Sequence, residues 1–284
     1  MGHGKFSRKA YAKLSKSKAY DTKSRSQIFT SANIDPEMDP KKATTRESRD
    51  SEEHPNSLAI IVGLDVTGSM GFVPEDIVKN TLPDLVETII EAGYPDPQVL
   101  FIGLGDFVYD RAPLQVGQFE SSTELLDRWL TKVYLEGGGG GNEGESYNLA
   151  YLFAARHTAI DCWEKRRQRG FLFTIGDEPC LANIPADIIT RLTPASQAST
   201  ITTADMLKEA QEKYKVYHMH LDHNNTARLP HRRAGWKELL GQNLTIVQDY
   251  KQVAKKIAHI VINDLDTVST TNPFLNSDSE EEIL

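Results

Sequence analysis

Three glycine-flanked stretches of this 284-residue chain concentrate oxygen-bearing side chains. In the first, GLDVTGSMGF, the side chains of Asp65, Thr67 and Ser69 alternate directly after the apolar run LAIIV. The second is EGGGGGNEGES (136–146), and the third is GDEP (176–179). Carboxylates and hydroxyls without clustered Cys or His favour a hard divalent cation, namely Mg²⁺, Mn²⁺ or Ca²⁺. The residue types therefore indicate metal binding through oxygen.

Such a site exists only if the neighbouring elements bring the three stretches together. The continuous apolar runs at 58–64 and 171–175 predict strands buried on both faces, as in a parallel sheet. The first strand leads to Asp65, and the second leads to Asp177. In an open α/β sheet, sites form beyond the carboxyl ends of the strands. The glycine run precedes a predicted helix and belongs at the same edge.

Strands and helices alternate from Leu58 to about Leu265, which predicts an α/β fold. The expected architecture is a doubly wound, mostly parallel central sheet with helices on both faces. Further strands are expected at 98–110, 215–223 and 243–250, with a short edge strand at 114–121. Helices are expected at 74–93, 122–137, 146–167, 185–192, 203–214 and 250–265. Pro83 predicts a kink in the first of these helices, or two shorter pieces.

The charge of the chain is unevenly distributed around a net value of −8. Residues 1–56 are basic at their start and lack apolar periodicity, so we expect a disordered extension outside the fold. Residues 57–266 form the expected domain, and residues 267–284 form an acidic tail. Nucleic acid is expected to bind, if at all, only through the basic arm.

The DVTGSM stretch resembles the metal-ion-dependent adhesion motif (MIDAS) of von Willebrand factor A (VWA) domains. Asp65, Thr67 and Ser69 fill the Asp-x-Ser/Thr-x-Ser signature, and Asp177 matches the Asp that follows a central strand in that family. The family normally has a Thr in the glycine-containing second loop, which this chain lacks. The resemblance implies that a residue of this loop replaces it, with Asn142 and Glu145 as first choices. It also places four residues beside the metal as partner contacts, namely Met70, Gly71, Glu143 and Glu178.

The resemblance implies a protein-binding module and no catalytic activity. Neutral hydroxyls complete the coordination shell without neutralising the cation, which then attracts an Asp or Glu carboxylate of a protein partner. Members of this type often act beside AAA+ ATPases or in larger assemblies, and we expect a cytoplasmic protein of bacterial or phage origin. Two cysteines without a recognisable framework agree with a reducing compartment. No apolar run approaches the roughly 18 residues that span a membrane.

Three alternatives to this interpretation remain open. DVTGS is similar to the phosphorylation loop of P-type ATPases and related phosphohydrolases, which would make Asp65 an aspartyl-phosphate nucleophile. Val66 stands where that pattern has Lys. The HMHLDH stretch offers His218, His220, Asp222 and His223 as a zinc site. In the third alternative Asp65 is only a helix cap, and the glycine run is a linker.

Overall fold

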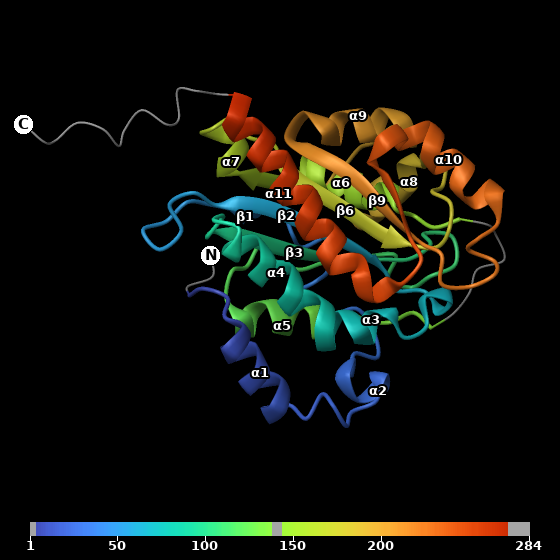
Figure 1. Ribbon diagram of the computed structural model, residues 1–284. Helices are drawn as coiled ribbons and strands as arrows, with labels where there is room; N and C mark the ends of the chain where they lie inside the picture. Colours follow the sequence, from blue (N-terminus) through green and yellow to red (C-terminus); the bar gives the residue numbers. More distant parts are fainter. Residues whose placement is uncertain (1–3, 138–143, 272–284) are drawn as a thin grey trace, which may run out of the picture.

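The computed structural model describes residues 4–137 and 144–271 (Figure 1). In this part of the chain, a six-stranded sheet has the order β10-β9-β6-β2-β3-β4. All neighbours in it are parallel except β3 and β4. The strands are β2 (Leu58–Asp65), β3 (Pro97–Leu104), β4 (Leu114–Val116), β6 (Gly170–Gly176), β9 (Tyr214–Leu221) and β10 (Leu244–Val247). The expected doubly wound, mostly parallel sheet is confirmed.

Helices cover both faces of the sheet, and alternate residues of β2 point to opposite faces. Leu58, Ile60, Val62 and Leu64 join the core beneath one set of helices, whereas Ala59 and Ile61 join the core beneath the other. The first set is α3 (Val73–Asp76), α4 (Leu82–Glu91), α5 (Thr123–Thr131) and α11 (Val253–Thr271). The second set is α6 (Asn148–Arg156), α8 (Ala186–Leu192), α9 (Thr203–Lys213) and α10 (Pro230–Leu240). Burial on both faces explains why β2 has no polar alternation.

The strand order reverses between β2 and β6. Numbered from β2 along the chain, the sheet reads 3-2-1-4-5-6, so that the chain leaves β2 toward β3 and later returns on its other side. In doubly wound sheets, ligands bind in the crevice at this switch point. Leu64 pairs with Ile175, and both strands therefore end side by side. The loops that carry Asp65 and Asp177 begin at this crevice.

The described part of the N-terminal segment packs on the domain, which contradicts the expected disordered extension. It contains α1 (Arg8–Ser17), α2 (Arg25–Ile28) and β1 (Arg46–Ser48). Its buried side chains join the core shared with α4 and α5, and they are Phe6, Tyr11, Tyr20, Ile28, Phe29 and Met38. Apart from one adjacent pair, neighbouring residues of this set are five to nine positions apart, and each packs individually rather than on a periodic face. That spacing is why the pattern resembled a disordered tail.

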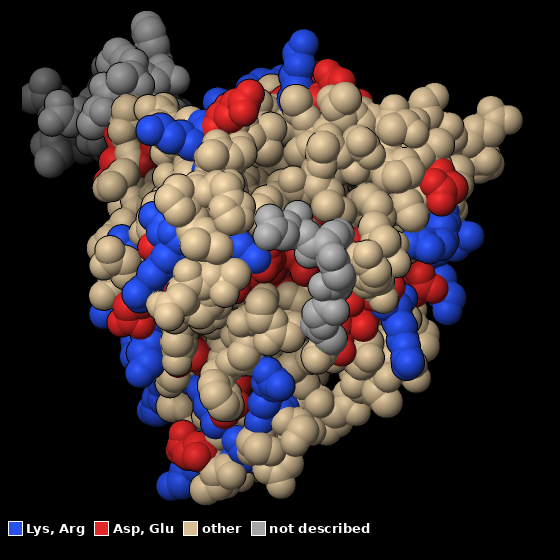
Figure 2. All heavy atoms as spheres, turned by 90° about the vertical axis from the view of Figure 1, so that its right-hand side faces the viewer, with Lys and Arg blue, Asp and Glu red and all other residues tan. Residues whose placement is uncertain are grey.

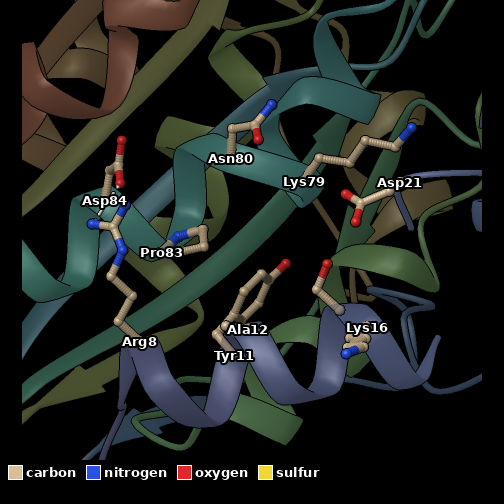
Figure 3. Close-up of a pocket in the computed structure, with 10 residues that line it drawn as sticks. Arg8, Tyr11, Ala12, Lys16, Asp21, Lys79, Asn80, Pro83 and Asp84 are labelled. Atoms are coloured by element: carbon tan, nitrogen blue, oxygen red, sulfur yellow. Dashed lines mark ion pairs between the residues drawn. The ribbon is translucent and has the colours of Figure 1, made fainter. Parts of the chain in front are cut away.

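Figure 3 shows the contact between α1 and the start of α4. Arg8 forms ion pairs with Asp84 and Glu87, at 3.0 and 2.8 Å. The hydroxyl of Tyr11 donates a hydrogen bond to the carbonyl of Val78. Lys79 donates to the carbonyl of Lys23. These contacts fasten the segment to the domain.

Two expected helices differ from the structure. Between α3 and α4 the backbone widens into a π-helical turn, Ile77–Thr81, just before Pro83. A proline lacks the amide hydrogen that a continuous helix needs, and the wider turn accommodates its ring. The helix expected at 146–167 ends at Arg156, and β5 (Thr158–Ile160) and α7 (Asp161–Glu164) follow. β5 forms because β1 of the N-terminal segment pairs with it.

Among the described residues, we find no helix with both the length and the apolar composition that membrane crossing requires.

Candidate metal centre

The carboxylate of Asp65 is the innermost group of the candidate site. It ends β2 and is 0% exposed. Its Oδ1 accepts hydrogen bonds from the Thr67 amide (2.9 Å) and the Thr67 hydroxyl (2.6 Å). Its Oδ2 accepts one from the hydroxyl of Tyr147 (2.7 Å). The alternation of Asp65 and Thr67 therefore folds the loop back onto its own carboxylate.

Ser69 joins this loop to the loop after β6. Its Oγ lies 3.3 Å from the Thr67 Oγ1 and donates a 2.8 Å hydrogen bond to Oδ1 of Asp177. Asp177 is 1% exposed. The structure thus brings together four of the predicted residues, Asp65, Thr67, Ser69 and Asp177. Two carboxylates and two hydroxyls form one chain of contacts across the switch point.

Tyr147 is a site residue that the sequence analysis missed. It lies on the turn before α6 and crosses over Gly176, where a Cβ would be 1.8 Å from the Tyr147 hydroxyl. Only glycine at position 176 allows this approach. Burial, and then the charge of Asp65, raises the pKa of Tyr147 well above its usual value. The tyrosine is therefore a neutral donor to Asp65. Gly176, directly before Asp177, was the signal in the sequence for such an approach.

The loop after β9 contributes two further residues that the sequence analysis did not assign to this site. Asn224 donates a 3.1 Å hydrogen bond to Oδ2 of Asp177. The Nε2 of His223 lies 3.1 Å from the carbonyl oxygen of Ser69. His223 had been considered only as a zinc ligand. Its loop reaches the crevice because β9 lies next to β6.

Glu145 is the candidate ligand of the second loop that lies within the described residues. Its amide donates to the Pro179 carbonyl (2.9 Å), and its carbonyl accepts from the Leu181 amide (3.1 Å), so this loop pairs with the loop after β6. The side chain is buried, and its Oε2 has no hydrogen-bond partner among the described residues. Burial, and then the charge of Asp65, raises the pKa of Glu145 to about 10. Asn142 and Glu143 lie outside the described residues.

The electrostatics of the site favour a cation. Burial, and then repulsion from Asp177, raises the pKa of Asp65 to about 7. In the described part of the chain, neither Asp65 nor Asp177 forms an ion pair with Lys or Arg. Buried carboxylates without a balancing charge are costly, and a bound cation would stabilise them. The same described residues contain no cluster of three or more His, Cys, Asp or Glu side chains suited to a metal. A cation here would depend on the hydroxyls as well.

The expected partner contacts have different outcomes. Met70 is 0% exposed, so the prediction that it contacts a partner is wrong. Its side chain fills the core under the loop, because the short helical turn Gly68–Met70 points it inward. The carbonyl of Gly71 accepts a hydrogen bond from Arg25 of the N-terminal segment. Glu178 forms an ion pair with Arg232 of α10.

The histidines of β9 act as packing residues. The ring of His218 stacks on the indole of Trp236, with centroids 3.6 Å apart, and its Nδ1 lies 2.8 Å from the Thr174 hydroxyl. The Nε2 of His220 lies 2.9 Å from the Ala227 carbonyl. Burial lowers the pKa of both rings. These contacts favour packing over the zinc alternative.

The edge of the sheet around the site is hollow and acidic, and the loops at this edge carry exposed apolar side chains. Figure 2 shows this edge, with Asp and Glu side chains in a hollow near its middle and Lys and Arg side chains around it. Among the described residues, the exposed large hydrophobic side chains are Phe72 (73%), Val108 (58%), Tyr109 (55%) and Leu229 (40%). They follow β2, β3 and β9, all at this edge. We call these four residues the apolar rim.

The comparison with protein families gave no match, and neither did the comparison with curated protein sequences. Similar solved structures include the pilus adhesin SpaC from Lactobacillus rhamnosus GG in its open conformation, at TM-score 0.49 and 11% identity. That match covers 77% of this chain and 31% of the adhesin. Proximal thread matrix protein 1 from the mussel byssus, in a structure with a zinc-occupied MIDAS motif, is similar at TM-score 0.40 and 11% identity. Its match covers 72% of this chain and 47% of that protein. The chain thus spans less than half of either protein.

Proposed function

We propose that this chain is a divalent-cation-dependent protein-binding module of the VWA type. The observation that carries the proposal is the contact chain from Asp65 through Thr67 and Ser69 to Asp177 at the switch point. Its all-oxygen donor set suits Mg²⁺, Mn²⁺ or Ca²⁺. The two carboxylates repel one another when no cation separates them.

The residues that would hold the cation are Asp65, Thr67, Ser69 and Asp177, with Glu145 nearby. The hydroxyls add oxygen ligands without adding negative charge, so the cation would keep an affinity for a further anionic oxygen. Tyr147 and Asn224 hold the two aspartates in position by donating to Oδ2 of each. We infer that the further oxygen is the carboxylate of a protein partner. An AAA+ ATPase or a larger assembly is the type of partner that the resemblance suggests.

The apolar rim supports a protein partner rather than a small anion. Large apolar side chains on a protein surface commonly mark interaction sites. Here they follow strands that end at the same edge as the acidic hollow, so we infer that a partner would present a carboxylate flanked by apolar side chains. A non-catalytic role is part of the proposal. Asp65 is fully buried and both of its oxygens accept hydrogen bonds, which suits a ligand better than the nucleophile of a phosphohydrolase.

Thermal unfolding with and without Mn²⁺ tests the metal site. A ligand that binds only the folded state stabilises it by about 2.7 kcal/mol at a hundredfold excess over its dissociation constant. We expect Mn²⁺ to raise the melting temperature of the wild type and not that of Asp65→Asn. The exposed Asp187→Asn on α8 is the matched control and should respond like the wild type. An equal response of Asp65→Asn and the wild type would overturn the metal site.

Selection from a displayed random-peptide library tests the partner chemistry. Peptides are bound to the immobilised protein in Mn²⁺ and released with chelator. We expect enrichment of Asp or Glu flanked by apolar residues with the wild type, and none with Asp65→Asn. If the peptides released by chelator share no carboxylate, the proposed partner chemistry is wrong. This outcome is independent of the thermal unfolding experiment, which tests the metal site alone.

A further inference from the structure

The edge of the sheet opposite the metal centre contains a cavity of about 1000 Å³. It lies where β2 and β9 begin, and α7 leads into it through the turn 165–169. Of its apolar lining residues, Trp163 is half-buried, whereas Leu58 and Leu265 are buried. The turn and Lys215 provide basic side chains. Ligand sites for small molecules have volumes of this order. The cavity is separate from the metal centre, because it lies at the other ends of the same strands.

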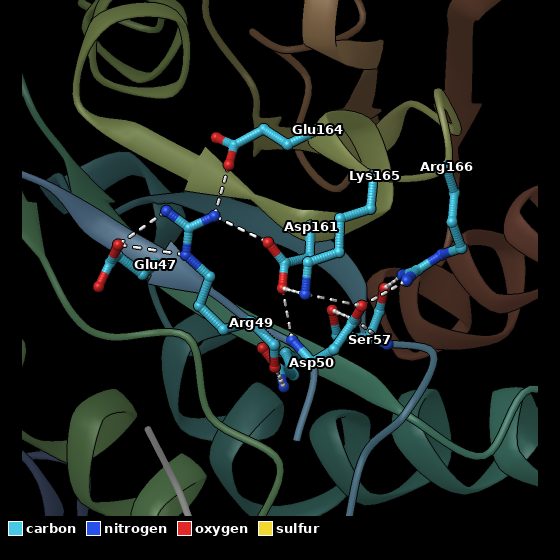
Figure 4. Close-up of polar contacts among 9 residues, drawn as sticks. Glu47, Arg49, Asp50, Ser57, Asp161, Glu164, Lys165 and Arg166 are labelled. Atoms are coloured by element: carbon cyan, nitrogen blue, oxygen red, sulfur yellow. Dashed lines mark hydrogen bonds and ion pairs between the residues drawn. The ribbon is translucent and has the colours of Figure 1, made fainter. Parts of the chain in front are cut away.

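Two of the four basic side chains of this cavity already have acidic partners. Arg166 donates to Oδ2 of Asp50 (2.7 Å) and to the Ser57 carbonyl (2.6 Å), as Figure 4 shows. Lys215 forms an ion pair with Asp264 of α11. These two residues fix the walls of the cavity and carry little free charge.

Arg167 and Arg169 have no such partner. Both are exposed, and neither forms an ion pair with a carboxylate in the described part of the chain. Arg169 donates to the Gln211 carbonyl, at 3.3 Å, and the guanidinium of Arg167 lies 5.5 Å from the centroid of the Trp163 ring. Two guanidinium groups and an indole ring therefore line the same cavity.

The turn that presents these arginines has a defined conformation. Arg167 has φ of +56°, a left-handed conformation that is unfavourable for any residue except glycine. Two backbone hydrogen bonds hold it, from the Arg167 amide to the Trp163 carbonyl (3.0 Å) and from the Gln168 amide to the Cys162 carbonyl (2.8 Å). A side chain on a held turn loses less entropy on binding than one on a free loop.

Two acidic side chains also line the cavity, and they do not cancel its charge. Asp96 is buried and accepts from the Asn56 amide, and it also contacts His54 and Lys5. Glu212 is exposed and is a single carboxylate beside the two free guanidinium groups. The charged side chains of the cavity without an ion-pair partner in the described part of the chain therefore have a net positive charge.

We propose that this cavity binds a phosphate-bearing ligand with a planar ring, of the size of a mononucleotide. Guanidinium groups match phosphate oxygens in a bidentate manner, and they do so better than ammonium groups. The half-buried indole of Trp163 gives the cavity an apolar wall that suits the ring. Inorganic phosphate would use only the arginines, and a nucleoside would use only the apolar wall.

Calorimetry on the full chain in chelator tests this proposal with adenosine and guanosine monophosphates as probes. Chelator removes any contribution of the metal centre. We expect binding of at least one monophosphate at or below about 1 mM. Arg167→Ala combined with Arg169→Ala should weaken it by tenfold or more. Both side chains are exposed, so we expect the fold to persist. The exposed pair Lys208→Ala with Lys237→Ala removes the same charge elsewhere and should bind like the wild type.

Further calorimetric measurements distinguish a mononucleotide site from sites for other ligands. Asp65→Asn should bind the monophosphate as the wild type does, and loss of binding in that variant would overturn a separate site. Equal affinity for the free nucleoside would overturn the role of the arginines. Equal affinity for inorganic phosphate would overturn the role of the ring. No binding of either monophosphate would overturn the proposal.

Discussion

The hydroxyl of Ser69 donates a 2.8 Å hydrogen bond to Oδ1 of Asp177, from a loop 108 residues away in sequence. This bond crosses the switch point between β2 and β6, where the two strands end side by side. A single hydroxyl thereby links the two carboxylates that a cation would share. The position of that hydroxyl follows from the spacing Asp65, Thr67, Ser69, because the loop turns back over its own aspartate.

Replacement of Ser69 should weaken cation binding without unfolding the protein. Ser69→Ala removes one candidate oxygen ligand and the support of Asp177. We expect a loss of about 10- to 100-fold in Mn²⁺ affinity, the range seen when groups that orient ligands are removed. Calorimetry measures it, with the exposed Ser199→Ala as a control that should match the wild type. An unchanged Mn²⁺ affinity of Ser69→Ala would show that this hydroxyl does not contribute to cation binding.

A methyl group at position 176 should destabilise the fold at the site. In Gly176→Ala the new Cβ meets the Tyr147 hydroxyl at 1.8 Å, and the ring is held by Trp236 and His218 on its other sides. Overpacking of this kind costs about 1–3 kcal/mol. Denaturant unfolding measures the loss. Gly235→Ala, inside α10 and with nothing within 4 Å of its Cβ, should instead gain about 0.5–1 kcal/mol. Equal free energies of unfolding for the two variants would contradict the close approach at Gly176.

Local patterns identified the six strands of the central sheet and two of the three loops, because burial on both faces leaves a continuous apolar run. The Asp65 and Asp177 positions followed from the strand ends alone. Tyr147, His223 and Asn224 could not be found in this way, since each reaches the site through contacts between distant loops. Gly176 was a visible clue to the first of them, because a glycine at a strand end can mark a close approach.

In the N-terminal segment, the sequence pattern failed to predict structure because its buried residues show no periodicity. Apart from one adjacent pair, its core residues are far from one another in sequence, so no window has a helical or strand period. Each fills a separate gap on a surface that only the folded domain provides. β5 was missed for the related reason that its partner strand, β1, lies in this segment.

Truncation of a buried side chain in this segment tests whether it belongs to the fold. Met38 is 0% exposed, and its carbonyl accepts a 2.8 Å hydrogen bond from the Val116 amide of β4. Met38→Ala should lower the free energy of unfolding by about 2–5 kcal/mol, the usual range for core truncations. Val108→Ala, at an exposed position, should stay within about 0.5 kcal/mol of the wild type. A Met38→Ala protein as stable as Val108→Ala would mean that the segment does not pack in solution.

The ion-pair network between the N-terminal segment and α7 should make stability depend on pH in the acid range. Asp161 accepts hydrogen bonds from Arg49 (2.8 Å) and the Asp50 amide (2.9 Å), and pairs with Lys165 at 2.6 Å (Figure 4). Burial opposes its ionisation, but the bonds from Lys165, the Asp50 amide and Arg49 outweigh burial and lower the pKa of Asp161 from 3.8 to about 2. A pKa that is lower in the folded state stabilises the protein above the unfolded value, and this stabilisation is lost as the pH falls through the folded value.

We therefore expect the wild type to lose about 1–2 kcal/mol between about pH 4 and pH 2 through this residue. Asp161→Asn should be less stable than the wild type at neutral pH, and the difference should shrink over that interval. Urea unfolding at a series of pH values measures both curves. The exposed Asp187→Asn should follow the wild-type curve. A constant difference between the wild type and Asp161→Asn down to about pH 2 would show that the carboxylate does not titrate below its usual range.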